Sequence, residues 1–145
     1  GAKDDVIDEW GHKTNLTERN NLLASVFKTS HESNIPITFL SGDVHSSSAY
    51  RLTSNTYPNS NVMNITSSGI SRKPAPKLAE KAMADSGIMF ENVDVDINNV
   101  FKMAGQNNFL IINVDNEEEL KIMATIYYGK SDSKSLKKYE FSITT

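Results

Sequence analysis

The stretch that decides the fold is Ile35-Pro-Ile-Thr-Phe-Leu-Ser-Gly-Asp-Val-His45. It opens with an apolar run over residues 35–40 and then passes through Ser-Gly into a carboxylate and an imidazole two positions apart. An apolar run of this length, bounded by turn residues, is typical of a buried strand. In extended backbone alternate side chains project to the same face, so Asp43 and His45 can reach one centre. The sequence therefore predicts a buried strand whose end presents two potential metal ligands.

The segments around this stretch predict a mixed α/β unit. Apolar side chains recur at helical spacing after Thr14 or Asn15, either of which can cap a helix that fades before Pro36. A second helix is expected to open at Pro74 or Pro76. Alternating and apolar runs predict strands over residues 61–66, 93–97, 108–114, 120–128 and 139–143, whereas residues 49–52 fit either a strand or a helix start.

Composition narrows the class of protein. The chain has 145 residues, a net charge of −3 and no repeat, which fits one domain or fragment over residues 1–145. We expect no nucleic-acid partner, because no Lys/Arg cluster with interleaved aromatics is present. No apolar run approaches the roughly 20 residues of a membrane-spanning helix. The opening Gly-Ala-Lys-Asp-Asp lacks a signal peptide's apolar stretch and resembles a cloning remnant, so the compartment stays open.

The chemistry of a metal site is limited by the absence of cysteine. His, Asp, Glu or Asn would have to hold the ion, and mixed oxygen and nitrogen ligands suit zinc, manganese or iron better than calcium. The alternative interpretation is ordinary turn chemistry, with Gly-Asp after a strand and a histidine nearby by chance. Two ligands also fall short of the four that zinc-type centres usually take. Spacing alone leaves both interpretations open.

The string FLSGDVHSS, residues 39–47, resembles the last metal-binding motif of PhoD-like (alkaline phosphatase D) phosphatases in the calcineurin-like metallophosphoesterase superfamily. Three flanking segments resemble family motifs in the same order: Asp8-Glu-Trp-Gly11, Asn64-Ile-Thr-Ser-Ser-Gly-Ile-Ser71 and Asn107-Asn-Phe-Leu-Ile-Ile-Asn-Val-Asp115. The resemblance runs from about residue 8 to residue 128. The family's D-x-H, G-D-x-x-D and G-N-H-[DE] motifs have no match in this chain.

The resemblance implies a fold and an activity. The fold would be the C-terminal half of a four-layer α-β-β-α sandwich, with mixed sheets and flanking helices. The activity would be hydrolysis of phosphate mono- or diesters by a dinuclear centre of divalent or trivalent ions (Mn, Zn, Fe or Ca). His45 is expected to ligate one ion, and Asp43 to ligate the other or to accept a hydrogen bond beside it. Four further residues are expected to position the substrate or to support the metal ligands: Asp8, Trp10, His12 and Ser67. His12 stands near the place of a tyrosine in the family.

The unmatched motifs supply most of the metal ligands in the family. The resemblance therefore implies that this polypeptide alone is inactive, with the missing N-terminal half of the same enzyme as its expected partner. Half of a two-sheet sandwich would expose sheet faces, which also favours self-association. The alternative function is a non-catalytic α/β binding or interaction module that kept the scaffold and lost the chemistry.

Overall fold

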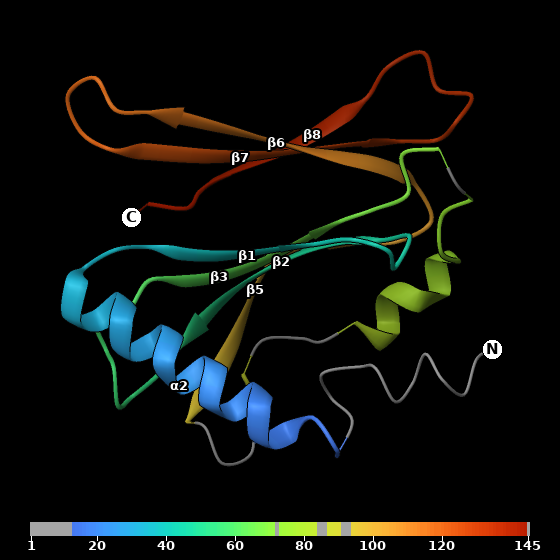
Figure 1. The fold of residues 1–145 in the computed structure, drawn as a ribbon. Helices are drawn as coiled ribbons and strands as arrows, with labels where there is room; N and C mark the ends of the chain where they lie inside the picture. Colours follow the sequence, from blue (N-terminus) through green and yellow to red (C-terminus); the bar gives the residue numbers. More distant parts are fainter. Residues whose placement is uncertain (1–12, 72, 84–86, 91–93, 145) are drawn as a thin grey trace.

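The structure, a computed structural model, describes residues 13–71, 73–83, 87–90 and 94–144. These residues form three layers: a helix, a five-stranded sheet that we call the mixed sheet, and a three-stranded antiparallel sheet (Figure 1). The predicted α/β class is confirmed. Within these ranges, no helix combines the length and the apolar character that crossing a membrane requires.

The elements follow one another along the chain as α2 (Leu16–Ser33), β1 (Ile37–Ser41), β2 (Ser47–Thr53), β3 (Val62–Ser67), the 3-10 helix η1 (Lys77–Ala82), β4 (Ile88–Phe90), β5 (Val95–Met103), β6 (Asn107–Asp115), β7 (Lys121–Gly129) and β8 (Lys137–Ser142). The strands predicted from residue 61 onward are all present. The ambiguous segment over residues 49–52 lies in a strand, β2.

The strand order in the mixed sheet brings the end of β1, the β1–β2 loop and the end of β3 together at one end of the sheet. The order is β1-β3-β2-β5-β4, with β1 parallel to β3 and β2 antiparallel to it. Ser41 pairs with Thr66 and Ser47 pairs with Ser67, so the β1–β2 loop, residues 42–46, arches over the carboxyl end of β3. The stretch that was predicted to carry the ligands therefore lies directly above the end of a central strand.

Helix α2 forms where its caps and apolar spacing predicted it. Asn15 occupies the N-cap position, and Asn34 ends the helix in a left-handed conformation with φ 54°. Leu23 and Phe27 pack on the mixed sheet, and Phe27 is 1% exposed. Burying a side chain of this size contributes about 2–3 kcal/mol. The core under the helix is completed by Tyr50, Leu52, Val62, Val95 and Ile97.

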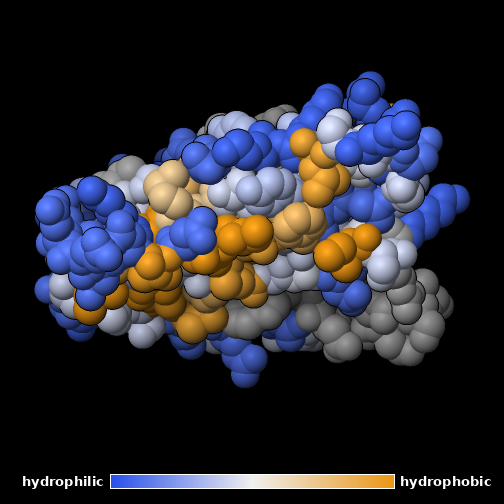
Figure 2. Space-filling model, turned by 90° about the horizontal axis from the view of Figure 1, so that it is seen from above, coloured by the Kyte–Doolittle hydropathy of each residue, from blue (hydrophilic) through white to orange (hydrophobic). Residues whose placement is uncertain are grey.

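A second core fills the space between the two sheets. Successive side chains of a strand point to opposite faces, so Ala49 and Met63 face away from α2 and meet Ala124 and Ile143. The centre of the mixed sheet is thus buried on both faces. The outer face of the antiparallel sheet differs: a hydrophobic band crosses it between hydrophilic ends (Figure 2), and Ile111 there is 41% exposed.

Two sequence predictions about local structure were wrong. The run over residues 35–40 is not a buried strand, because β1 has β3 as its one neighbour in the described residues, and Leu40 is 58% exposed. The helix predicted after Pro76 is the short 3-10 helix η1. Its Leu78 is 72% exposed, so no buried apolar stripe stabilises a longer α-helix there.

Candidate metal-binding loop

The β1–β2 loop holds Asp43 and His45 in left-handed backbone conformations, with φ 68° and φ 51°. The expectation that they sit at alternate positions of extended backbone was therefore wrong. The physical reason is the topology, since the chain must reverse across the end of β3 within five residues. A non-glycine residue in this region costs about 1–3 kcal/mol and persists only where its surroundings enforce it. Such residues cluster at functional sites.

The surroundings that enforce this loop come from the segment after β3. The His45 N–H donates to the Ser68 hydroxyl at 3.3 Å, and the His45 carbonyl accepts from the Ala75 N–H at 2.8 Å. The Ser68 N–H also donates to the Ser46 carbonyl at 3.2 Å. Gly69 packs against the same backbone, since a Cβ on it would lie 3.5 Å from the His45 Cα. Both backbone groups of His45 are thus fixed.

The two candidate ligands keep their side chains available. Asp43 is exposed and His45 is half-buried. Neither the carboxylate nor the imidazole has a hydrogen-bond or ion-pair partner within the described ranges. The same ranges hold no cluster of three or more His, Asp or Glu side chains that could bind an ion. The loop therefore presents one oxygen and one nitrogen donor.

Asn108, at the start of β6, contacts the segment beneath the candidate loop and was not among the predicted site residues. It is 2% exposed, and its side-chain oxygen accepts from the Ser67 hydroxyl at 2.9 Å and from the Ser68 N–H at 3.0 Å. Its side-chain nitrogen donates to the Ser68 carbonyl at 2.6 Å. Asparagine is disfavoured within strands. A pair of them opening a strand, Asn107-Asn108, was the signal that this position has a polar partner.

The remaining predicted site residues separate into two groups. Ser67 is half-buried, and its hydroxyl donates a hydrogen bond to the side-chain oxygen of Asn108. Asp8, Trp10 and His12 lie outside the described residues. The serines after His45 are not nucleophile candidates: Ser47 is fully buried and donates to the Thr66 carbonyl at 2.9 Å.

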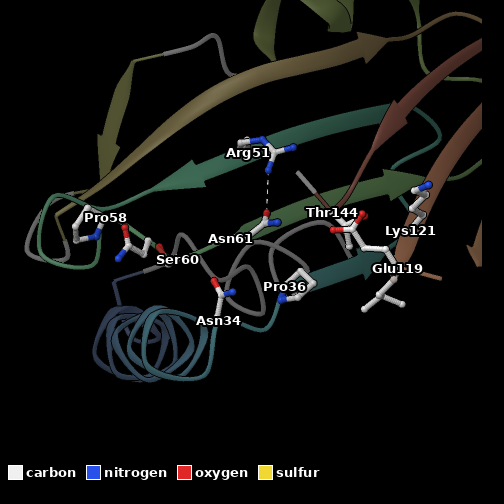
Figure 3. Close-up of a pocket in the computed structure, with 11 residues that line it drawn as sticks. Asn34, Pro36, Arg51, Pro58, Ser60, Asn61, Glu119, Lys121 and Thr144 are labelled. Atoms are coloured by element: carbon white, nitrogen blue, oxygen red, sulfur yellow. Dashed lines mark hydrogen bonds between the residues drawn. The ribbon is translucent and has the colours of Figure 1, made fainter. Parts of the chain in front are cut away.

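A hollow of about 890 Å³ lies elsewhere, at the opposite end of the mixed sheet (Figure 3). Its lining includes Arg51, Asn61, Lys121 and Thr144 and does not include Asp43. Volume alone would favour this hollow as a ligand site. We place the candidate centre at the β1–β2 loop instead, because the enforced backbone and the two available donors are there.

The chain matches the family described as PhoD related phosphatase over residues 1–136. The chain belongs to the PhoD related phosphatase family. This membership confirms the resemblance seen in the sequence and indicates a phosphoesterase function. Searches among curated proteins and among solved structures gave no significant match.

In this PhoD related chain, three of the family-like segments meet at one end of the fold. The loop with residues 42–46 is hydrogen-bonded to the segment that follows β3, and that segment is hydrogen-bonded to Asn107 and Asn108 (Figure 1). The segments are far apart in sequence. Their hydrogen bonds bring the three family-like segments together at the candidate site.

Proposed function

We propose that this chain carries part of the active site of a metal-dependent phosphoesterase that hydrolyses phosphate mono- or diesters at a dinuclear centre. Asp43 and His45 are the metal ligands that it contributes. The observation that supports this most directly is the β1–β2 loop, in which a strained backbone presents a carboxylate and an imidazole that have no partner among the described residues. Family membership supplies the reaction class.

The donor set fits the proposed ions. One carboxylate and one imidazole suit manganese, zinc or iron. Held there, such ions would supply charge stabilisation for an in-line displacement at phosphorus, and Asp43 and His45 would be the residues of this chain that hold them. Within the chain, Ser68 and Ala75 hold the backbone of His45 and so limit the directions that its imidazole can take.

Two donors do not complete a dinuclear centre, because each ion takes about four ligands or more. We propose that a preceding part of the same polypeptide supplies the rest and completes a calcineurin-like four-layer sandwich. Large apolar side chains around the candidate site support this arrangement: Leu40, Val44 and Ile70 are 58%, 57% and 69% exposed. The exposed band on the antiparallel sheet marks a second face for a covering layer (Figure 2).

The test uses the complete gene product with Mn²⁺, assayed on p-nitrophenyl phosphate and on its bis-ester. Removing a residue that only hydrogen-bonds to a metal ligand lowers metal affinity or activity by about 10–100-fold, and removing a ligand itself should cost at least as much. We therefore expect His45→Ala and Asp43→Ala each to lower turnover by about 100-fold or more. His31→Ala is the matched control, because the Nδ1 of His31 accepts from the Asn59 N–H beside the distant hollow. Unchanged turnover in His45→Ala would remove the proposed role.

A second experiment tests whether residues 1–145 contain all the ligands that turnover requires. Residues 1–145 alone are expected to show no turnover, and addition of the preceding part of the polypeptide should restore it. Turnover by residues 1–145 alone would contradict the proposed division of ligands. A complete gene product that is folded, binds no Mn²⁺ and lacks turnover would favour a non-catalytic binding module.

A further inference from the structure

Asn108 connects the two sheets at the end that carries the candidate ligands. It lies in β6 of the antiparallel sheet, and its side chain reaches the end of β3 in the mixed sheet. A side chain that is 2% exposed has no water to satisfy its amide, so its partners must come from the protein. Those partners are Ser67, Ser68 and the Gln106 carbonyl, which lies 3.4 Å from the amide nitrogen.

The side chain of Asn108 holds both the N–H and the carbonyl of Ser68. The side-chain oxygen of Asn108 accepts from the Ser68 N–H, and its side-chain nitrogen donates to the Ser68 carbonyl. The peptide groups on both sides of Ser68 are therefore held by a single amide. The fixed backbone sets the direction of the Ser68 Cα–Cβ bond, from which the hydroxyl reaches the His45 N–H.

The constraint continues into the ligand loop. The Ser68 hydroxyl accepts the hydrogen bond of the His45 N–H, and His45 is one of the two residues of the β1–β2 loop with a left-handed backbone. A path of two residues thus leads from the antiparallel sheet to the candidate ligand. Residues that orient metal ligands from outside the first coordination shell commonly control metal affinity.

We propose that Asn108 is a positioning residue for the metal centre: through Ser68 it holds the backbone of His45 in the conformation that directs the imidazole to the ion. This inference rests on the proposed function, in which His45 is a ligand. It adds a role for a residue that contacts neither metal nor substrate.

A matched control is available at the opposite end of the mixed sheet. Asn61 also joins the two sheets by its side-chain amide, which donates to the Ile143 carbonyl at 3.0 Å and accepts from Arg51 at 2.8 Å (Figure 3). Its substitution should lower stability by a similar mechanism without contact to the ligand loop. Comparison of Asn108→Ala with Asn61→Ala therefore separates positioning from general stability.

The experiment measures Mn²⁺ binding to the complete gene product by the electron paramagnetic resonance signal of the free ion. Asn108→Ala is expected to weaken binding by about tenfold or more, and Asn61→Ala by less than about twofold at a comparable thermal stability. Equal effects of the two substitutions, or unchanged binding in Asn108→Ala, would overturn the inference.

A milder pair of variants covers the case in which Asn108→Ala does not fold. Ser68→Ala removes the hydroxyl that accepts the His45 N–H and should weaken Mn²⁺ binding, whereas Ser68→Thr keeps a hydroxyl and should restore it. Identical binding in both variants would overturn the proposed path. Failure of the proposed function has a different signature: the unsubstituted protein would bind no Mn²⁺, or His45→Ala would bind it unchanged.

Discussion

The guanidinium of Arg51 donates a hydrogen bond of 2.8 Å to the side-chain oxygen of Asn61 (Figure 3). A second guanidinium nitrogen donates to the Ser142 carbonyl at 3.3 Å, and the Asn61 amide donates to the Ile143 carbonyl. Two polar residues of the mixed sheet thus anchor the end of β8. The acceptors of this tie are the backbone carbonyls of Ser142 and Ile143, where β8 ends, and a polar side chain satisfies each of them.

Loss of this tie should destabilise the fold. Arg51→Met leaves the partner acceptors beside an apolar side chain, and we expect the free energy of unfolding to fall by about 1–3 kcal/mol. Urea denaturation followed by circular dichroism measures the change. Lys28→Met, at a lysine paired with Glu32 on the exposed side of α2, should stay within about 0.5 kcal/mol. Equal losses in both variants would show that the inter-sheet tie contributes nothing.

The helix-facing core should tolerate truncation poorly. Phe27→Ala removes a ring that is 1% exposed and leaves a cavity, so a loss of about 3–5 kcal/mol in unfolding free energy is expected. Leu22, on the same helix, is 38% exposed, and Leu22→Ala should cost about 1 kcal/mol or less. Thermal denaturation of the two variants side by side tests the predicted packing of α2, which a reversed order would contradict.

Two glycines with similar backbone angles provide a steric comparison. Gly105 has φ 79° and Gly87 has φ 83°, so alanine at either position incurs a left-handed penalty of about 1–2 kcal/mol. A Cβ on Gly105 would lie 3.1 Å from the Lys77 Cβ, whereas one on Gly87 would meet no described atom within 4 Å. Gly105→Ala should therefore be the more destabilising by about 1 kcal/mol in chemical denaturation. Similar losses would mean that η1 moves aside freely.

Asp94 should make stability depend on acid pH. Hydrogen bonds from the Thr56 side chain, the Asn55 amide and the Thr56 N–H lower the pKa of this carboxyl from its ordinary value of 3.8. Because the folded pKa is the lower one, its contribution is present above pH 3.8 and is lost as pH falls through the folded value. Denaturation midpoints measured from pH 6 to pH 2 should fall less steeply in Asp94→Asn. Asp132→Asn, in the exposed β7–β8 loop, should retain the slope of the unsubstituted protein.

Sequence reasoning located the elements whose signals are local. Helix α2 has its caps at Asn15 and Asn34, and the β6–β7 hairpin has two apolar runs around a charged turn, so each could be predicted without tertiary information. The edge position of β1 could not be predicted, because an apolar run looks the same whether one neighbour or two cover it.

The candidate site shows the same limit. Asp43 and His45 were predicted as ligands from their residue types and spacing, whereas their left-handed backbone depends on the loop passing over β3, a strand that comes later in the chain. The role proposed for Asn108 rests on a hydrogen bond with Ser68, 40 positions away in the sequence. A pairing between two sheets leaves no periodic trace in either segment.

Among the residues that the structure describes, the edge of β1 away from β3 has no partner strand, and β1 sets the direction of any strand that pairs there in parallel. Strands that pair in parallel end at the same side of a sheet, and β1 already ends there beside β3. A strand recruited to that edge in parallel would thus bring its own carboxyl end level with Asp43. Ligands that follow such a strand would then lie at the same end of the mixed sheet as Asp43. A strand paired in the antiparallel direction would place them at the opposite end of the sheet.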